Sequence, residues 1–470
     1  MTLTMSVMQS QLTNTKNSVA LPSSAHLRMA ENWSLIRALL GGTKTMRAAG
    51  ESLLPRHPAE SRDDYAIRLQ RAVLTNYYTA TVKHLVGKAF SKPLVLQDDV
   101  PAQIAQWAEN IDLQGTHLND FAANLFSDVI SMGFTSILVD YPKQILGTTL
   151  AEEREAGGRP YMSMVRAENI LGVRTEGPTN KIQVARLREE TLGIDGEFGE
   201  KEVHRIRALF PGSYRLYELG TNKEYVVVDE GLMSPLQEVP LIPVYGQKIA
   251  PWLGEPKLLD LAYKNIQHYQ IDSDVDNALR VACFPMLAVS GWNADRDPII
   301  KVGPNVVLAT SESQGKFYYV EHSGAAIAAG RQRLEDIKAE MAIMGIQMLM
   351  PQASSAVTAT EAQIKYVEST SDLQRMAFGL KDALENALVF MAKWIGLADG
   401  GSIELKGQFT LPRDAATEAQ ALIQLRMAGE ITSTTLLSEL KRRDFLPDDF
   451  DIEAERELLS LEAPSNVFGE

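Results

Sequence analysis

Cysteine is almost absent from this chain, because Cys283 is the only one in 470 residues. A single thiol cannot form a disulfide within the chain, and this usage is typical of proteins that fold in a reducing compartment. Long hydrophobic runs are absent as well. The most apolar stretch, residues 341–350, contains Gly345 and Gln347 and is shorter than the roughly 18 apolar residues that span a bilayer. We therefore expect a chain without internal disulfides and without a membrane partner.

Motifs of common catalytic and metal sites are missing too. The nearest matches to a phosphate-binding loop are Gly87-Lys88 and Gly315-Lys316, but neither has the earlier glycine or the following Ser or Thr. The chain contains no H-E-x-x-H, no G-x-S-x-G and no paired C-x-x-C, and its seven histidines show no ligand spacing. We therefore predict a protein that is not an enzyme and that needs no cofactor and no metal.

Three alternating carboxylates, Asp272, Asp274 and Asp276, superficially match the start of a calcium loop. The match fails further on, because the turn glycine is replaced by Asn277 and the bidentate glutamate by Cys283. On a helix the three side chains also fan over more than one face. An acidic surface patch is therefore favoured over a metal site.

Basic residues are outnumbered, with 46 Lys and Arg against 60 Asp and Glu, a net charge of -14. This balance argues against a protein whose affinity comes from neutralising nucleic-acid phosphates. It is typical of a soluble protein, and it also suits a surface along which DNA slides without sticking. Five basic residues in the helix predicted at 62–90 are expected to be solvated, with phosphate contact as the alternative: Arg62, Arg68, Arg71, Lys83 and Lys88.

The most prominent pattern is a helix, a short loop and a longer helix over residues 325–397. The first helix, 325–350, repeats apolar residues at three-to-four spacing from Ile327 to Met348. Residues 351–357 begin with a proline and form the loop. The second helix, 358–397, starts with a Thr358–Glu361 capping box. It continues the apolar stripe from Ile364 to Ile395 and extends for roughly 58 Å. Helices of this length need neighbours, from the same chain or from copies of it.

The remaining pattern predicts an α+β fold that is mainly helical. Residues 1–30 are expected to form a flexible arm, since the first 26 are polar and lack a signal-type apolar block. Residues 43–61 are expected to be loop and 453–461 a charged tail. Helices are predicted at 33–40, 62–90, 102–111, 118–131, 256–283, 415–427 and 434–443. Strands are predicted at 134–140, 161–166, 181–188, 203–210, 214–219, 224–228, 241–245, 286–289, 306–309, 317–320 and 402–409, with an antiparallel sheet in the middle group.

Several phrases occur in the same order as in one protein family. They are Leu-Pro-Arg-His-Pro-Ala-Glu-Ser at 54–61, Gly-Phe-Thr-Ser-Ile-Leu-Val-Asp-Tyr-Pro at 133–142, Thr-Ala-Thr-Glu-Ala at 358–362 with 380–388 beyond it, and Leu-Ser-Glu-Leu-Lys-Arg-Arg at 437–443. Together with the order of elements, they make the chain resemble the portal proteins of tailed bacteriophages, the head-tail connectors, and most closely a portal-like subgroup.

The resemblance implies a division of the chain. Residues 31–255 correspond to a mixed α/β wing, 256–283 and 325–350 to two stem helices, and 284–324 to a small β-containing clip. Residues 351–357 correspond to a tunnel loop, 358–397 to a long wing helix, and 398–470 to a C-terminal wing and crown region.

The resemblance also implies sites. Tunnel-loop residues would touch phosphates through neutral hydrogen bonds, and a nearby lysine on the preceding helix is the candidate cation; the residues are Gln352, Ser354, Ser355 and Lys338. Charged clip residues would contact partners; they are Asp295, Arg296, Asp297 and Lys301. Each assignment has an open alternative. The loop is then an ordinary connection between helices, and Lys338 only pairs with a neighbouring carboxylate. Because the loop has no Lys or Arg, we expect it to guide DNA more than to hold it.

The implied function is a dodecameric portal ring at one vertex of the virion capsid, assembled in the bacterial cytoplasm. It would serve genome packaging and ejection, with double-stranded DNA in its channel. Its partners would be the large terminase, the head-tail adaptor and the major capsid protein or scaffold. The alternatives are a minor capsid or head-completion protein and, third, a phage-encoded hydrolase.

Overall fold

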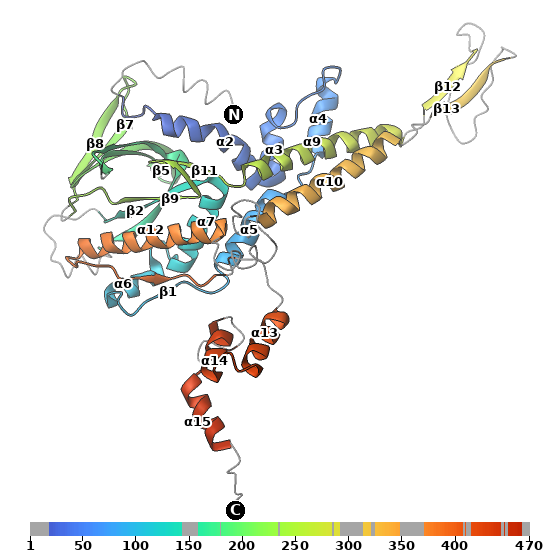
Figure 1. The fold of residues 1–470 in the computed structure, drawn as a ribbon. Coiled ribbons are helices and arrows are strands. Elements are labelled where there is room, and N and C mark those ends of the chain that lie inside the picture. Colours follow the sequence, from blue (N-terminus) through green and yellow to red (C-terminus); the bar gives the residue numbers. More distant parts are fainter. Residues whose placement is uncertain are drawn as a thin grey trace, which may run out of the picture. The chain divides into compact units, whose positions relative to one another are not determined.

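The chain is described here from a computed structural model. It describes residues 18–142, 158–178, 180–233, 236–283, 286–291, 314–320, 325–347, 371–407, 409, 415–442, 446 and 450–462. The chain divides into two compact units, Met1–Phe409 and Thr410–Glu470. The fold is α+β, as predicted (Figure 1). Within the described residues no helix combines the length and hydropathy needed to cross a membrane.

The first part of the larger unit is helical. Its elements are α2 (Ser24–Leu40), α3 (Gly42–Ala49), the 3-10 turn η1 (Gly50–Ser52), α4 (Arg62–Arg71), α5 (Tyr77–Ala89), α6 (Ala102–Trp107), η2 (Ala108–Asn110) and α7 (Leu118–Met132). The helices predicted at 102–111 and 118–131 are confirmed. The helix predicted at 33–40 is longer, since Ser23 caps it by accepting a hydrogen bond from the His26 amide.

Two predictions in this part are wrong. Residues 43–61 are not all loop, because they contain α3 and η1. The single helix predicted at 62–90 is broken between α4 and α5. Asn76 caps α5 there, because its side chain accepts a hydrogen bond from the Thr79 amide. The amide of Tyr78 donates to Asn265 Oδ1 of a distant helix. This break is therefore made by a tertiary contact and a local cap together.

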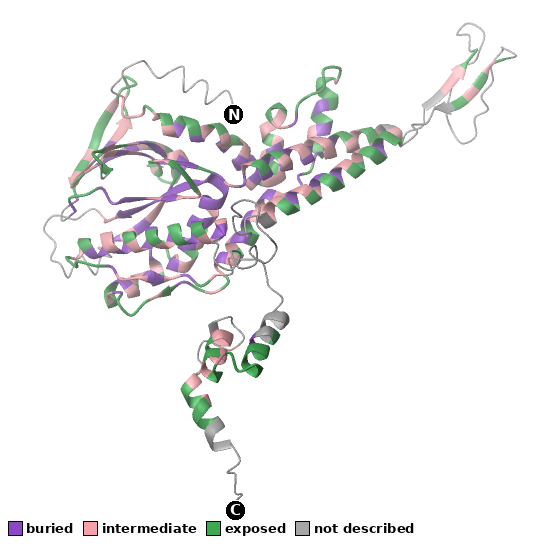
Figure 2. Ribbon diagram, viewed as in Figure 1, coloured by how far each residue is buried: buried purple, intermediate pink, exposed green. Residues whose placement is uncertain are grey.

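A three-stranded antiparallel sheet forms the centre of the larger unit, in the order β3-β2-β9. Its strands are β2 (Phe134–Asp140), β3 (Tyr161–Arg166) and β9 (Leu241–Tyr245), all at their predicted positions. β2 is buried along nearly its whole length (Figure 2). Gly133, before it, has φ +79°, and a Cβ there would lie 2.2 Å from the Glu255 carbonyl carbon. Only glycine fits this turn.

A second antiparallel sheet is a five-stranded meander in the order β4-β5-β6-β7-β8. The strands are β4 (Ile170–Glu176), β5 (Lys181–Asp195), β6 (Gly199–Phe210), β7 (Ser213–Leu219) and β8 (Tyr225–Leu232). β5 and β6 extend further than predicted, and β4 was not predicted. Small two-stranded pairs join β10 (Gln247–Ala250) to β11 (Leu253–Glu255) and β1 (Val95–Leu96) to β14 (Ile403–Glu404). The strand predicted at 402–409 is thus only two residues long.

Two long helices and a small β pair follow. α9 (Leu259–Ala282) and α10 (Ala325–Gln347) pack side by side (Figure 1). In the sequence between them, β12 (Met286–Ser290) pairs antiparallel with β13 (Lys316–Val320). The predicted order of helix, β structure and helix is confirmed; the strand predicted at 306–309 lies outside the described residues.

The long helix after the loop is shorter than predicted. α12 runs from Asp372 to Trp394, about 34 Å. Ser371 has φ -67° and ψ 159° and accepts a hydrogen bond from the Gln374 amide, so it is an N-cap. The prediction of one helix that runs without a break from residue 358 through Ser371 is therefore wrong. The predicted Thr358–Glu361 capping box lies outside the described residues. The predicted apolar stripe is confirmed within α12, since the following residues are at most 3% exposed: Leu373, Met376, Leu380, Leu384, Leu388 and Met391. Its first two residues, Ile364 and Val367, lie outside the described residues.

The smaller unit contains α13 (Ala415–Met427), α14 (Ser433–Arg442) and α15 (Ile452–Glu462). The first two were predicted within a residue of their bounds. The predicted charged tail is instead a helix, α15. Its leucines and isoleucine recur at helical spacing among the charges, a pattern that outweighs the tail-like composition.

Candidate functional site: the α9–α10 hairpin

Both helices of the α9–α10 hairpin bury apolar side chains. Those at most 8% exposed are Leu261, Ala262, Ile266 and Tyr269 of α9, and Ile327, Leu334, Ile337 and Met341 of α10. The helices approach closely at Gly330, where a Cβ would lie 2.6 Å from Val275 Cγ2. This burial follows from the three-to-four spacing of the sequence, and it fixes which faces of the two helices remain outside.

The charges of the hairpin are largely paired with one another. Lys264 Nζ lies 2.6 Å from Glu340 Oε2, and Arg333 Nη1 lies 2.9 Å from Glu340 Oε1. Hydrogen bonds from these two cations lower the pKa of Glu340. The two helices together carry seven carboxylates against five basic side chains. The hairpin is therefore an acidic surface in which most cations are already neutralised.

Lys338 is the one predicted site residue that the structure places. Its Nζ lies 2.6 Å from Glu335 Oε1, one turn earlier on α10, and this hydrogen bond raises the pKa of Lys338. Its side chain is 35% exposed. The sequence left two roles open for Lys338, a cation for DNA phosphates or a partner of a neighbouring carboxylate. The described geometry shows the pair with the carboxylate.

The other predicted site residues cannot be placed. The tunnel-loop residues Gln352, Ser354 and Ser355 lie outside the described residues. So do the clip residues Asp295, Arg296, Asp297 and Lys301.

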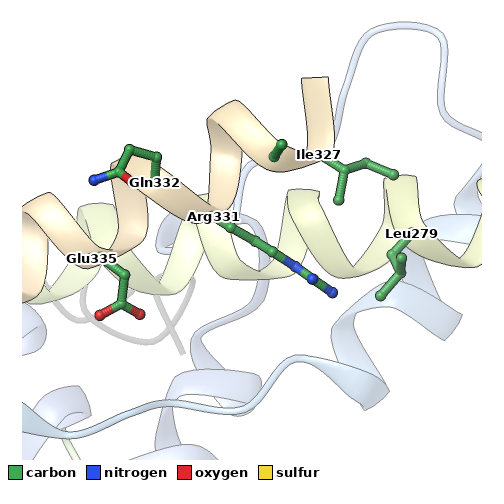
Figure 3. Close-up of a pocket in the computed structure, with 6 residues that line it drawn as sticks. Leu279, Ile327, Arg331, Gln332 and Glu335 are labelled. Atoms are coloured by element: carbon green, nitrogen blue, oxygen red, sulfur yellow. The ribbon is translucent and has the colours of Figure 1, made fainter. Parts of the chain in front are cut away.

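An open groove of about 470 Å³ runs along the hairpin (Figure 3). Its lining combines apolar with polar and charged side chains from both helices: Leu279, Ile327, Ala328, Arg331, Gln332 and Glu335. An open groove with so few convergent polar groups suits a packed side chain or helix better than an enclosed small molecule.

The three alternating aspartates of α9, Asp272, Asp274 and Asp276, have separate environments. Asp274 pairs with Arg68 and His57, with 3.3 Å to each. Asp272 is half-buried, and burial raises its pKa despite the nearby His268. Asp276 is exposed. Among the described residues no group of three or more His, Cys, Asp or Glu is placed to hold a metal ion.

His268 is buried at the junction of α9, α10 and α5. It is 2% exposed, and its ring packs edge-on against Tyr77 with 5.9 Å between centroids. Within the described part of the chain neither ring nitrogen has a hydrogen-bond partner. Burial lowers the pKa of His268, so the neutral ring is favoured.

A buried ion pair that the sequence did not reveal joins α4 to the segment before it, and the same arginine reaches Asp274 of α9 at 3.3 Å. Arg68 Nε lies 2.8 Å from Glu60 Oε1, and its Nη2 donates to Glu60 Oε2 at 2.9 Å and to the Pro55 carbonyl at 2.8 Å. The two side chains are only 3% and 8% exposed. The hydrogen bond from Arg68 lowers the pKa of Glu60.

Residues 54–61 therefore form a structural clamp. The Leu54 carbonyl accepts from the Tyr65 hydroxyl at 2.9 Å, and Ser61 caps α4 through the Asp64 amide. The expectation that Arg68 is solvated is wrong. The sequence shows Glu60 within residues 54–61, but only the fold shows that this carboxylate pairs with Arg68.

Comparisons with known proteins give one family and several structures. Residues 257–395 match the family described as "Domain of unknown function (DUF4055)". No curated protein matches the chain. The chain is similar to one from "Neck of native GTA particle computed with C12 symmetry", with 13% identity, a TM-score of 0.43, and coverage of 84% of this chain and 98% of that chain.

Two further structures give comparable values. One is titled "Neck of empty GTA particle computed with C6 symmetry", with 14% identity, a TM-score of 0.43 and coverage of 86% and 99%. The other is "Virion of native gene transfer agent (GTA) particle", with 13% identity, a TM-score of 0.40 and coverage of 86% and 99%.

Proposed function

We propose that this chain is a portal-type subunit: a non-enzymatic protein that forms a ring at one vertex of a phage-like capsid. DNA passes through the ring during packaging and ejection. The observation that carries the proposal is the α9–α10 hairpin, two long packed helices with a small antiparallel β pair inserted between them in sequence. In this role the hairpin is the stem, and the inserted β pair belongs to the clip that docks the terminase and the adaptor.

The phrases shared with portal proteins support the proposal because two of them have definite tasks in the described fold. Residues 54–61 hold α4 through the Arg68–Glu60 pair and contact the stem helix α9 through His57 and Asp274. Residues 133–142 include the buried central strand β2 and its entry turn at Gly133. Both phrases thus occur where the hairpin is joined to the rest of the larger unit.

The charges of the stem suit a DNA conduit. A channel that grips phosphates with free cations retards the duplex, because each neutralised phosphate adds to the affinity. Three of the five basic side chains of the two helices, Lys264, Arg333 and Lys338, are instead paired with carboxylates. DNA in contact with this surface slides, and the neutral side chains Gln352, Ser354 and Ser355 of the proposed tunnel loop position it through hydrogen bonds.

Exposed apolar side chains on the stem favour assembly with further copies. Tyr263 is 53% exposed and Ile343 is 57% exposed. In a closed ring, each copy covers such positions on its neighbour through a heterologous contact. The proposed ring is a dodecamer by resemblance to the portal family.

Negative-stain imaging and native mass measurement of the purified full chain test the proposal. We expect closed rings with a central channel at micromolar protein and moderate salt. A chain that stays monomeric under these conditions, in both measurements, contradicts the portal assignment.

A further inference from the structure

The β5–β6 hairpin ends in a two-stranded ribbon that the rest of the sheet does not support. β4 pairs with β5 only as far as Leu187, and β7 pairs with β6 only from Arg205 onward. Beyond those points β5 and β6 pair only with each other, to Asp195 and Gly199. An isolated two-stranded ribbon is marginally stable in water.

The ribbon exposes large apolar side chains at its end. Leu192 is 68% exposed, Ile194 is 85% exposed and Phe198, in the turn, is 91% exposed. Side chains this exposed and this close together are typical of a surface that another molecule covers.

One face of the ribbon combines apolar and acidic side chains. Directly opposite residues of an antiparallel pair share a face, so Leu192 lies beside Glu202, and Ile194 lies beside Glu200. Among the described residues neither Glu200 nor Glu202 has an ion-pair partner. The face therefore presents two apolar side chains next to two uncompensated carboxylates.

The same chain carries a surface with the opposite charge. A small depression between α4 and α9 is lined by Ile67, Arg71 and Arg280, among others. Ile67 is 44% exposed, and Val73 just beyond α4 is 57% exposed. Within the described part of the chain Arg71 and Arg280 form no ion pair, whereas the buried Arg68 is paired with Glu60. Asp276 is also in the lining. With one carboxylate against Arg71 and Arg280, the depression keeps an excess of positive charge.

We infer that the β5–β6 ribbon of one copy docks onto the α4–α9 depression of a second copy. Both surfaces are exposed, so they do not cover each other within one chain. Their residue types match in kind: two apolar residues with two free carboxylates against two apolar residues with two free guanidiniums. A contact between two different surfaces of the same chain is heterologous and closes into a ring when the rotation permits. The inference rests on the proposed ring function and supplies one of its interfaces.

Site-directed cross-linking in the full chain tests this contact. Two differently tagged chains, both carrying Cys283→Ser, are co-expressed; one carries Ile194→Cys and the other Ile67→Cys. A short bismaleimide is expected to yield a product that bears both tags. Thr191→Cys replaces Ile194→Cys in the matched control, because Thr191 lies on the opposite face of the ribbon, and it is expected to yield no such product.

A charge swap adds specificity to the test. Glu200→Arg with Glu202→Arg is expected to lower the yield of the two-tag product by about tenfold, through like-charge repulsion. Arg71→Glu with Arg280→Glu in the other chain is expected to restore it. Wild-type rings without any Ile194–Ile67 product overturn the inference and leave the ring proposal intact. The product without rings supports the inference and contradicts the ring proposal.

Discussion

At the scale of single residues, buried charges are the sharpest features of this protein. The Arg68–Glu60 pair is almost fully shielded from water, and the Pro55 carbonyl accepts a further hydrogen bond from Arg68. Burial makes such a pair costly to break, since the remaining charge has no solvent to stabilise it.

Replacing Arg68 with Met is therefore expected to destabilise the protein by roughly 3–5 kcal/mol, because Glu60 stays buried without its cation and keeps only the His57 amide as a donor. Urea unfolding of the full chain measures this. Arg62→Met, on the exposed side of the same helix, is the control and is expected to change stability by at most about 0.5 kcal/mol. The double variant Arg68→Met with Glu60→Gln removes the unpaired carboxylate as well. If it loses less stability than Arg68→Met alone, the unpaired charge of Glu60 causes the destabilisation; equal losses contradict this cause.

Asp128 is a second buried charge, and we expect its replacement to raise stability where the replacement of Arg68 lowers it. Burial raises its pKa, although Arg37 and Arg166 oppose this from 3.8 and 3.9 Å. A carboxyl whose pKa is higher in the folded state lowers stability above that pKa, and the loss disappears as the pH falls below its unfolded pKa. Arg37 also pairs with Glu168 at 2.8 Å, so replacing Asp128 does not leave this arginine without a carboxylate.

Asp128→Asn is thus expected to raise the melting temperature at pH 7.5. The gain should shrink steadily as the pH is lowered toward 4. Thermal unfolding over this pH series is the measurement. A variant that is less stable than wild type at pH 7.5 contradicts the assignment of Asp128 as a destabilising buried charge.

At the scale of elements, α12 shows how one helix is set by both its start and its buried face. Ser371 is fully buried; its Oγ donates to the Phe409 carbonyl at 2.6 Å and accepts from the Gln374 amide at 3.1 Å. The stripe that follows packs on β9 and β2. The cap fixes where the helix begins, and the stripe fixes which way it faces.

Ser371→Ala removes both hydrogen bonds and is expected to cost about 1–2 kcal/mol of stability. Ser371→Thr keeps the hydroxyl and serves as the control. Denaturant unfolding of both variants measures the difference. Equal stability of Ser371→Ala and wild type shows that the helix does not depend on this cap.

Leu384→Asp places an unpaired charge in the centre of the α12 stripe, where Leu384 is 0% exposed. Such a burial is expected to abolish folding or assembly. Asn386→Asp introduces the same charge on the exposed side of the helix and is expected to behave as wild type in size-exclusion chromatography. A folded, assembled Leu384→Asp protein refutes the buried-stripe assignment.

At the scale of the whole molecule, the proposed ring separates assembly from DNA handling. Deleting residues 352–355 removes Gln352, Ser354 and Ser355 of the proposed tunnel loop. Rings are expected to form normally, while DNA packaging or retention falls. Imaging and a packaging assay measure the two properties separately. Lys338→Ala is expected to leave both unchanged, because Glu335 already neutralises this lysine. Failed ring assembly after the deletion shows instead that the loop is structural.

The sequence by itself determined the elements whose cause is local. The α9–α10 hairpin, the buried strand β2 and the stripe of α12 follow from apolar spacing, because burying one face of a helix or strand depends on its own periodicity. Only the tertiary structure decided the rest. The break before Tyr78 involves Asn265, the burial of Arg68 needs Glu60 and Pro55, and β4 exists because β5 pairs with it. These features depend on partners brought together by folding, and the exposed ribbon of β5 and β6 is evident only once its neighbouring strands are seen to end.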